Sequence, residues 1–327
     1  MRAYMERPKI FATHIFLKDF LEKLSKDYEI VVYEGKDITR KELLSGVSGA
    51  SAIVSLLTEK IDREVMDAAG NKLKVICNYA VGYDNIDIRE ATKRGVCVTN
   101  TPGVLTESVA EHVMALIMSL YRRVLEGDRL VRSGTFKGWE PDLLLGTSLK
   151  NKVIGVVGLG RIGRWTVRLA KAFGMHPIYF NRTRDFEFEA EMDCKFHSLD
   201  KLLEMSDVVS LSLPLTNETK GIFDYKCFKK MKKSAIFINT SRGKIVVEQD
   251  MVEALSSGLI AGAGIDVFDD ETNIPDKLLK MENVVLTPHI ASATDEARKA
   301  MATVLVDNLV DAIEGRSPSC LVNLVKT

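Results

Sequence analysis

Three reactive side chains follow short apolar segments in the second half of the sequence. Arg242 lies in "INTSRG", Glu271 in "GAGIDVFDDETN" and His289 in "TPHIASAT". Each preceding segment is typical of a buried strand, and parallel strands place their carboxyl ends along one edge of a sheet. Each residue alone has an ordinary explanation, as a surface charge, a loop acid or a loop histidine. Together they give a cation, a carboxylate and an imidazole at three strand ends, which is the composition of an acid–base site.

A glycine-rich turn lies upstream of these residues in "KVIGVVGLGRIGRWTVRLAKAFG". An apolar strand segment meets Gly158, Gly160 and Gly163, and a helical pattern starts at once. Glycines here permit a tight turn, close approach of a pyrophosphate to backbone N–H groups, and close contact between helix and strand. The strand, turn and helix context predicts a dinucleotide-binding site rather than a turn that serves packing alone.

The segment "YFNRTRD" stands where such a fold usually presents an acidic residue to the adenosine ribose, but it holds Asn181 and then Arg182. Asn181 would not repel a ribose 2′-phosphate as a carboxylate would. Arg182 and Arg184, with the Thr183 hydroxyl between them, can give charge-assisted hydrogen bonds to that phosphate. NADP(H) is therefore the preferred cofactor. The alternative is that both arginines are merely solvated and NAD(H) binds through other contacts.

Short Val/Ile-rich segments alternate with helical patterns along the whole chain, which predicts parallel sheets covered by helices. Eleven segments are expected to be strands: "KIFATH", "EIVVYE", "SAIVSLL", "KVICNYA", "VCVTN", "KVIGVVG", "HPIYFN", "DVVSLSLP", "SAIFINTS", "AGAGIDVF" and "NVVLTPH". Eleven strands exceed one ordinary open sheet, so two doubly wound α/β domains are expected. The first would be flavodoxin-like, residues 1–99 completed by 292–327. The second would be a Rossmann domain, residues 100–291.

Two long helices are expected to link these domains. Ser108 and Glu111 have the spacing of a capping box, and apolar residues then recur at helical spacing through Val131. The segment 293–314 is again amphipathic with no strand after it, so we expect it to return to the N-terminal domain.

Composition limits the remaining classes of function. The 327 residues include 45 Lys and Arg and 45 Asp and Glu, a balance that argues against nucleic-acid binding. The five cysteines form no C-x-x-C pair, so neither a disulfide framework nor a metal site is expected. The longest apolar segment, "VMALIMSLY", is too short to span a membrane, and the N-terminus is charged. These features favour a cytoplasmic globular protein.

The chain resembles the D-isomer-specific 2-hydroxyacid dehydrogenase family, and within it the glyoxylate and hydroxypyruvate reductases. The resemblance covers nearly the whole sequence. It rests on these motifs, in the order and at the spacing typical of the family: "NYAVGYDNIDI", "VTNTPGVLTESVAEH", "LLLGTSLKNKVIGVVGLGRIG", "INTSRG", "GAGIDVF" and "TPHIASAT".

The resemblance implies a role for each matching residue. Arg242 would bind the carboxylate and carbonyl oxygen of a small 2-keto acid, Glu271 would pair with the imidazole, and His289 would be the general acid that also contacts substrate. Backbone groups of Val81 and Gly82 would bind substrate from the first domain, with the site between the domains. The implied cofactor contacts, together with those derived above, are Thr106, Gly158, Leu159, Gly160, Arg161, Ile162, Gly163, Asn181, Arg182, Thr183, Arg184, Pro214, Thr219, Thr240, Ser241, Asp266, His289 and Ala291. Asp266 would lie near the nicotinamide ribose or carboxamide.

Two places depart from the family pattern. Ala291 replaces a common glycine, and Thr272 replaces the proline that often follows the catalytic glutamate. Glu271 has the family spacing of five residues after Asp266, but Asp270 remains an alternative. Trp139 resembles an aromatic that approaches a neighbouring subunit's substrate pocket. It fits an anchor of the dimer interface equally well.

The family implies a homodimer built around the helix that begins near Ser108 and the segment after it. The apolar residues there could equally be buried within one subunit. The expected reaction is reduction of glyoxylate to glycolate or of hydroxypyruvate to D-glycerate. Two alternatives share the fold: D-3-phosphoglycerate dehydrogenase, whose relatives mostly carry the acid that Asn181 replaces, and a dinucleotide-sensing transcriptional corepressor.

Overall fold

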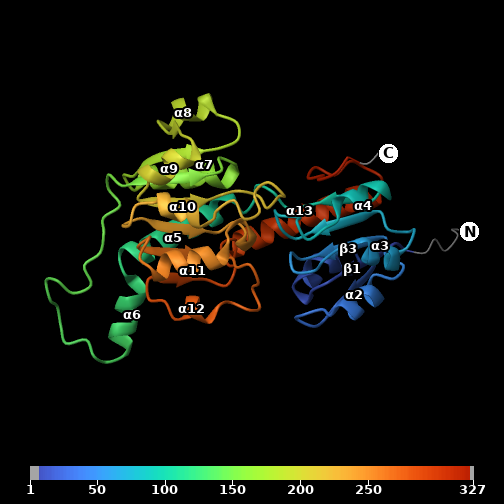
Figure 1. Cartoon of the computed structure of the whole chain (residues 1–327). Helices are drawn as coiled ribbons and strands as arrows, with labels where there is room; N and C mark the ends of the chain where they lie inside the picture. The colour runs from blue at the N-terminus through green and yellow to red at the C-terminus, as the bar shows by residue number, and fades with distance from the viewer. Residues whose placement is uncertain (1–6, 325–327) are drawn as a thin grey trace, which may run out of the picture. The chain divides into compact units, whose positions relative to one another are not determined.

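The computed structural model describes residues 7–324 (Figure 1). Contacts between Cα atoms divide the chain into two compact units. Unit 1 holds the residues up to Leu105 together with those from Thr294 onward, and unit 2 is Thr106–Ala293. Each unit is built on one sheet whose strands are all parallel, and this confirms the predicted fold class of two doubly wound α/β domains.

The sheet of unit 1 has the order β2-β1-β3-β4-β5. The five strands are β1 (Lys9–Ala12), β2 (Glu29–Val32), β3 (Ala52–Ser55), β4 (Val75–Asn78) and β5 (Cys97–Thr99). This is the flavodoxin-like order, in which the chain reverses direction across the sheet next to its first strand. The central strands β3 and β4 are buried along their whole length, because helices cover both faces.

The helices of unit 1 are short, with one exception. They are η1 (Ile15–Leu17), α1 (Lys18–Leu21), η2 (Glu22–Leu24), α2 (Arg40–Gly46), α3 (Arg63–Ala69), α4 (Ile88–Lys93) and the long α13 (Asp295–Ile313). Side chains of α2, α3 and α4 share one core with Phe11, Ile53 and Ile76 of the sheet. Helix α13 packs against β4, β5 and α1. Its first turn is capped by the Thr294 hydroxyl, which accepts from the Ala297 N–H at 3.2 Å.

The sheet of unit 2 has the order β12-β11-β10-β9-β6-β7-β8. The strands are β6 (Val153–Val157), β7 (His176–Phe180), β8 (Lys195–Phe196), β9 (Val208–Leu211), β10 (Ile236–Asn239), β11 (Gly262–Ile265) and β12 (Val284–Leu286). The chain runs outward from β6 to β8, returns to β9 on the other side of β6, and then runs outward again. This Rossmann order puts the topological switch point between β6 and β9.

Helices lie on both faces of this second sheet. They are α5 (Thr106–Tyr121), α6 (Val124–Arg132), α7 (Arg161–Ala172), α8 (Phe186–Met192), α9 (Leu199–Met205), α10 (Tyr225–Lys230), η3 (Gly243–Ile245), α11 (Glu248–Ser256) and α12 (Asp276–Leu279). On one face α5 packs against α7 over Ile154 and Ile238. On the other, α9, α10 and α11 enclose the rings of Phe223, Phe228 and Phe237, whose centroids lie 4.7–5.3 Å apart.

All eleven segments expected to be strands contain a strand in the structure, and the segment 293–314 contains α13. The two-residue edge strand β8 was not predicted, because two residues carry no readable alternation. The capping box at Ser108 was wrong. Helix α5 begins at Thr106, directly after a turn in which Gly103 has a φ of +91°, so Ser108 lies inside the helix.

The helix expected to continue through Val131 is divided into α5 and α6. Arg123 has a left-handed φ of +52°, a conformation that no helix interior tolerates, and its guanidinium binds Glu126 through two hydrogen bonds of 3.0 and 2.6 Å. The spacing of apolar residues predicts helical structure, but it does not reveal a break in the backbone such as the one at Arg123.

Candidate active site

The glycine turn lies at the switch point of unit 2, between the end of β6 and the start of α7. Gly158 has a φ of +102°, and a Cβ there would approach the Ser212 carbonyl oxygen to 2.5 Å. A Cβ on Gly163 would come within 2.1 Å of the Gly158 carbonyl oxygen. These two positions therefore require glycine, one for the turn and one for the close contact of helix and strand.

Gly160 differs from its two neighbours because a Cβ there would meet no atom within 4 Å. It is the N-cap of α7, and no side chain caps the helix. Arg161 and Ile162 form the first turn of that helix, which contains no acidic residue, and Leu159 is buried beneath it. Open space beside uncapped backbone N–H groups at a helix N-terminus fits the pyrophosphate of a dinucleotide.

The residues predicted to contact the adenosine end follow β7 directly. Arg182 and Thr183 are exposed, and the Asn181 amide donates to the Thr183 carbonyl at 3.0 Å. Arg184 instead binds Glu189 through two hydrogen bonds of 2.7 and 2.8 Å and stacks on Phe186. The Arg182 side chain forms no hydrogen bond or ion pair with residues 7–324. The two arginines are thus in different environments, a difference that the sequence did not indicate.

The other predicted cofactor residues lie mostly after strands of the same sheet edge. Thr106 is buried at the start of α5. After β9, the Thr219 hydroxyl donates to the Pro214 carbonyl at 2.6 Å, which closes that loop. Thr240 and Ser241 follow β10, and the Ser241 hydroxyl donates to the Leu211 carbonyl of β9 at 2.8 Å. This bond joins the carboxyl ends of β9 and β10, next to the switch point between β6 and β9.

Arg242 is placed by a close backbone contact. A Cβ on the next residue, Gly243, would lie 1.9 Å from the Phe268 carbonyl carbon, so the turn after β10 touches the loop after β11. Buried Asn239 fixes the turn from within, because it accepts from the Ser241 N–H at 3.0 Å and donates to the Arg242 carbonyl at 3.1 Å. This glycine therefore brings the backbone of Arg242 next to the loop that carries the acidic residues, and the Arg242 guanidinium donates to the Ser241 carbonyl at 2.8 Å.

His289 and Glu271 are in direct contact, with 2.6 Å between the histidine Nδ1 and the Glu271 Oε1. Their side chains keep 21% and 40% of their surface exposed, so the pair is accessible to a small molecule. Asp270 instead accepts from the N–H and hydroxyl of Thr272 at 2.9 and 2.6 Å. Those bonds lower the pKa of Asp270. Of the two acids left open by the sequence, Glu271 is the one that contacts His289.

The loop that carries His289 is held by Asp266, which is completely buried. Its carboxylate accepts from the N–H groups of Ile290 and Ala291, both at 2.9 Å, and from the Thr287 hydroxyl at 2.6 Å. Burial alone would raise the pKa of Asp266, but hydrogen bonds from the side chains of His112 and Thr287 and from the two N–H groups outweigh it, so the pKa is lowered. His289 itself has a φ of +54°, which this network maintains.

The sequence predicted Asp266 as a cofactor contact, whereas the structure shows that its carboxylate holds the loop of His289. The Asp266 carboxylate already accepts three hydrogen bonds from the protein, two at Oδ1 and one at Oδ2. A direct contact of Asp266 with a cofactor stays a prediction. His112 and Thr287 were not predicted. The His112 Nε2 lies 3.0 Å from the Thr287 hydroxyl and 3.5 Å from Asp266. The motif "AEHVMA" does not indicate that its histidine, His112, contacts Thr287 in the loop after β12 and not the core.

Val81 and Gly82 belong to unit 1, in the loop that follows β4. Both are half-buried, and each carbonyl oxygen accepts a side-chain hydrogen bond, from Asn100 at 2.7 Å and from Asn78 at 2.8 Å respectively. Their contact with a substrate stays a prediction.

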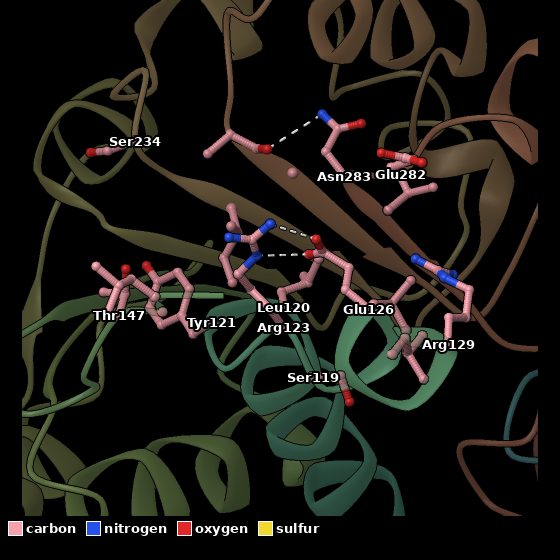
Figure 2. A pocket seen from close by; sticks show the side chains of 18 residues that line it. Ser119, Leu120, Tyr121, Arg123, Glu126, Arg129, Thr147, Ser234, Glu282 and Asn283 are labelled. Carbon is pink, nitrogen blue, oxygen red and sulfur yellow. Dashed lines mark hydrogen bonds and ion pairs between the residues drawn. The ribbon is translucent and has the colours of Figure 1, made fainter. Parts of the chain in front are cut away.

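A pocket of about 220 Å³ in unit 2 lies away from these residues (Figure 2). Ile236, Gly262 and Val284, which begin β10, β11 and β12, contribute to its lining, so it opens at the amino edge of the sheet. Arg123, the N-cap of α6, and Glu126 in the first turn of that helix are joined by the dashed lines in Figure 2. The residues predicted to do chemistry all follow carboxyl ends and are not part of this pocket.

Other kinds of site have no support among residues 7–324. The five cysteines are free thiols, and burial raises the pKa of the Cys77 thiol to about 12. No group of three or more metal-binding side chains is found in this part of the chain. None of the helices described is long and apolar enough to cross a membrane.

A Rossmann sheet with a glycine turn at its switch point, and an imidazole, a carboxylate and a guanidinium at the same strand ends, defines a nicotinamide-dinucleotide-dependent dehydrogenase. The family model "D-isomer specific 2-hydroxyacid dehydrogenase, NAD binding domain" matches residues 114–291. The chain belongs to this family.

Relatives agree over almost the full length. A glyoxylate reductase of Thermococcus litoralis is 47% identical, with 97% of each chain covered. One of Korarchaeum cryptofilum is 46% identical, with 97% of this chain and 96% of the relative covered. Among solved structures, the NADPH-dependent glyoxylate/hydroxypyruvate reductase of Sinorhizobium meliloti, in complex with NADP and malonate, has a TM-score of 0.85 at 33% identity, with 97% of both chains covered.

Proposed function

We propose that this enzyme reduces glyoxylate, and also hydroxypyruvate, with a hydride from NADPH. The observation that carries the proposal is the 2.6 Å contact of His289 with Glu271, on the same sheet edge as Arg242 and the glycine turn. Relatives named glyoxylate reductase match over nearly the whole chain and support the choice of substrate.

In the proposed mechanism His289 is the general acid. Glu271 accepts a hydrogen bond from Nδ1, which fixes the plane of the imidazole and leaves the proton on Nε2 available. The bound nicotinamide supplies the hydride to the keto carbon. As that carbon is reduced, the Nε2 proton passes to the developing alkoxide oxygen, and the product is a 2-hydroxy acid.

Arg242 is proposed to orient the keto acid for this step. A guanidinium can bind a carboxylate and a carbonyl oxygen together, and this would fix the keto carbon relative to His289. The close contact of Gly243 with Phe268 supports that role, because it couples the position of the guanidinium to the loop of Glu271. The N–H groups of Val81 and Gly82 are proposed as additional donors to the substrate carboxylate.

The preference for NADPH is proposed to depend mainly on Arg182. Arg182 is exposed directly after β7, which supports a contact with a ribose 2′-phosphate, and Asn181 does not repel a phosphate. Thr183 can add a hydroxyl donor. Arg184 contributes less in this proposal, because its Nε and Nη2 groups already donate hydrogen bonds to the Glu189 carboxylate.

The active form is proposed to be a homodimer formed through α6 and the segment that follows it. No side chain of α6 is buried, and five apolar residues in this region each keep between 46% and 84% of their surface exposed: Val124, Val131, Phe136, Trp139 and Leu145. Such a group of exposed apolar side chains marks an interface. Light scattering should give twice the chain mass for the wild type and a reduced mass for a variant with glutamate at Val124 and Val131. A wild-type monomer would contradict the proposal.

The proposed reaction is tested by the substrate specificity of the purified protein. Glyoxylate, hydroxypyruvate, pyruvate and phosphohydroxypyruvate are supplied separately with NADPH or NADH, and oxidation of the nicotinamide is followed. Higher kcat/KM for the first two, with D-glycerate formed from hydroxypyruvate, is expected. A preference for phosphohydroxypyruvate would instead make D-3-phosphoglycerate the physiological product.

A further inference from the structure

The loop after β4 holds a row of carbonyl groups in fixed directions. The carbonyl of Ala80 accepts from the Thr101 N–H at 2.9 Å, that of Val81 from the Asn100 amide at 2.7 Å, and that of Gly82 from the Asn78 amide at 2.8 Å. Three consecutive peptide planes are thereby anchored from one side. The donors lie on β4 or just after β5, in the same unit.

Each anchored plane also determines the direction of an N–H group. No peptide bond described is cis, and in a trans peptide the N–H points opposite to the carbonyl of the preceding residue. The N–H groups of Val81, Gly82 and Tyr83 therefore point away from the groups that hold their carbonyls. None of the three finds an acceptor among residues 7–324, and all three residues are at least partly exposed. Backbone N–H groups without a protein acceptor are available to bind an anion.

The amide that anchors Gly82 is itself fully used. Asn78 is 1% exposed, and its amide donates to the Gly82 carbonyl and to the Asn85 side chain at 3.1 Å. Its own oxygen accepts from the Ser55 hydroxyl at 3.0 Å. Asn85 in turn donates to the carbonyls of Leu56 and Glu59 at 2.9 and 3.0 Å. A satisfied buried network has one arrangement, so it holds the loop rigidly.

We infer that Asn100 and Asn78, the latter held by Asn85, are positioning residues that orient the N–H groups of Gly82 and Tyr83 to receive the substrate carboxylate. The N–H of Val81 is oriented beside them by the Thr101 backbone. The inference rests on the proposed function and adds to it the third donor, Tyr83, and the side chains that orient the N–H groups of Gly82 and Tyr83. Prepared donors bind the carboxylate equally in the ground state and the transition state, so they lower KM without raising kcat. The network thereby favours 2-keto acids over neutral carbonyl compounds.

The test replaces the anchor that is least buried. Asn100→Ala frees the Val81 carbonyl, and KM for glyoxylate should rise about 10- to 100-fold, while kcat and KM for NADPH stay within about twofold. Asn78→Asp should act in the same direction, because it puts an acceptor against the Gly82 carbonyl. The matched control is Asn323→Ala. Asn323 is also buried in unit 1, but it binds the backbone of Val96 and Val98 and not this loop. It should lower Tm without changing KM.

An unchanged KM for glyoxylate in Asn100→Ala would overturn the inference and leave the proposed reaction standing. A wild type that reduces no 2-keto acid would refute the reaction, and the inference would then be decided by calorimetric titration of oxalate. Weaker oxalate binding in Asn100→Ala than in Asn323→Ala would support it. Equal binding in both variants, or no binding by the wild type, would overturn it.

Discussion

At the scale of single residues, the site depends on which polar groups are already engaged within the protein. Asp270 and Glu271 are adjacent and chemically similar, but Asp270 binds Thr272 whereas Glu271 binds His289. Arg182 and Arg184 differ in the same way, since only Arg184 has a carboxylate partner. The sequence favoured Glu271 by the family spacing and kept Asp270 as an alternative, but it did not distinguish Arg182 from Arg184, because hydrogen-bond partners depend on side-chain direction.

Glu271→Gln should lower kcat/KM for glyoxylate about 100-fold, because an amide cannot stabilise the protonated imidazole as a carboxylate does. Asp270→Asn is the matched control and should change kcat/KM less than about threefold. Steady-state kinetics of both variants provide the comparison. If Asp270→Asn is the more damaging substitution, the pairing of His289 with Glu271 is not the functional one.

Arg182→Ala should raise KM for NADPH about 10- to 100-fold and leave KM for NADH nearly unchanged, since only NADPH carries the phosphate that the guanidinium would bind. Arg184→Ala should have a smaller effect on the ratio of the KM for NADPH to the KM for NADH. Equal losses with both cofactors in Arg182→Ala would contradict the proposed phosphate contact.

At the scale of secondary-structure elements, strand ends position the chemistry and loop contacts refine it. The strands and the long C-terminal helix were predictable, because buried apolar runs and helical periodicity recur over many residues. The break at Arg123, the buried bonds of Asp266 and the roles of His112 and Thr287 were not. The bonds of Asp266, His112 and Thr287 join residues distant in sequence, which no local pattern encodes. The break at Arg123 is a backbone conformation, which the recurrence of apolar side chains does not reveal.

Gly243→Ala should damage the site more than the fold. Its Cβ would approach the Phe268 backbone to 1.9 Å, so the loops of Arg242 and Glu271 must separate. We expect destabilisation of about 1–3 kcal/mol and a fall in kcat/KM of at least about 100-fold. The control is Gly127→Ala in α6, where the Cβ has ordinary contacts at 3.8 Å and no such loss is expected. Thermal melts and steady-state kinetics check this prediction. A Gly243→Ala variant with full activity would refute the coupling between the loops of Arg242 and Glu271.

Asp266→Asn should destabilise unit 2 in a pH-dependent manner. The pKa of Asp266 is lowered in the folded state, so its ionised form stabilises the fold above the ordinary value near 3.8, and that stabilisation is lost as pH falls through the lowered pKa. At neutral pH the variant should lose about 2–3 kcal/mol of unfolding free energy. The difference from wild type should narrow below about pH 4. Urea titrations that give a constant difference down to pH 3 would show that the charge of Asp266 does not matter.

At the scale of the whole molecule, the class of enzyme could be predicted from composition and from the order of the motifs. Two sheets, the family and the dehydrogenase activity followed from strand segments and motifs spread over 327 residues. The surface of α6 shows what such information leaves out. Its apolar residues continue the helical pattern of α5, yet none is buried in the chain. An apolar helical pattern predicts that one face of the helix is buried, but it does not show whether the residues that bury it belong to the same subunit or to another.

The most direct test of the account is the initial rate of NADPH oxidation with glyoxylate, measured side by side for wild type and His289→Ala. We predict steady turnover by the wild type and a kcat about 100- to 10,000-fold lower in the variant, with the KM for NADPH little changed. Comparable rates for the two proteins would contradict the assignment of His289 as the proton donor, and no turnover by a folded wild type would contradict the proposed reaction itself.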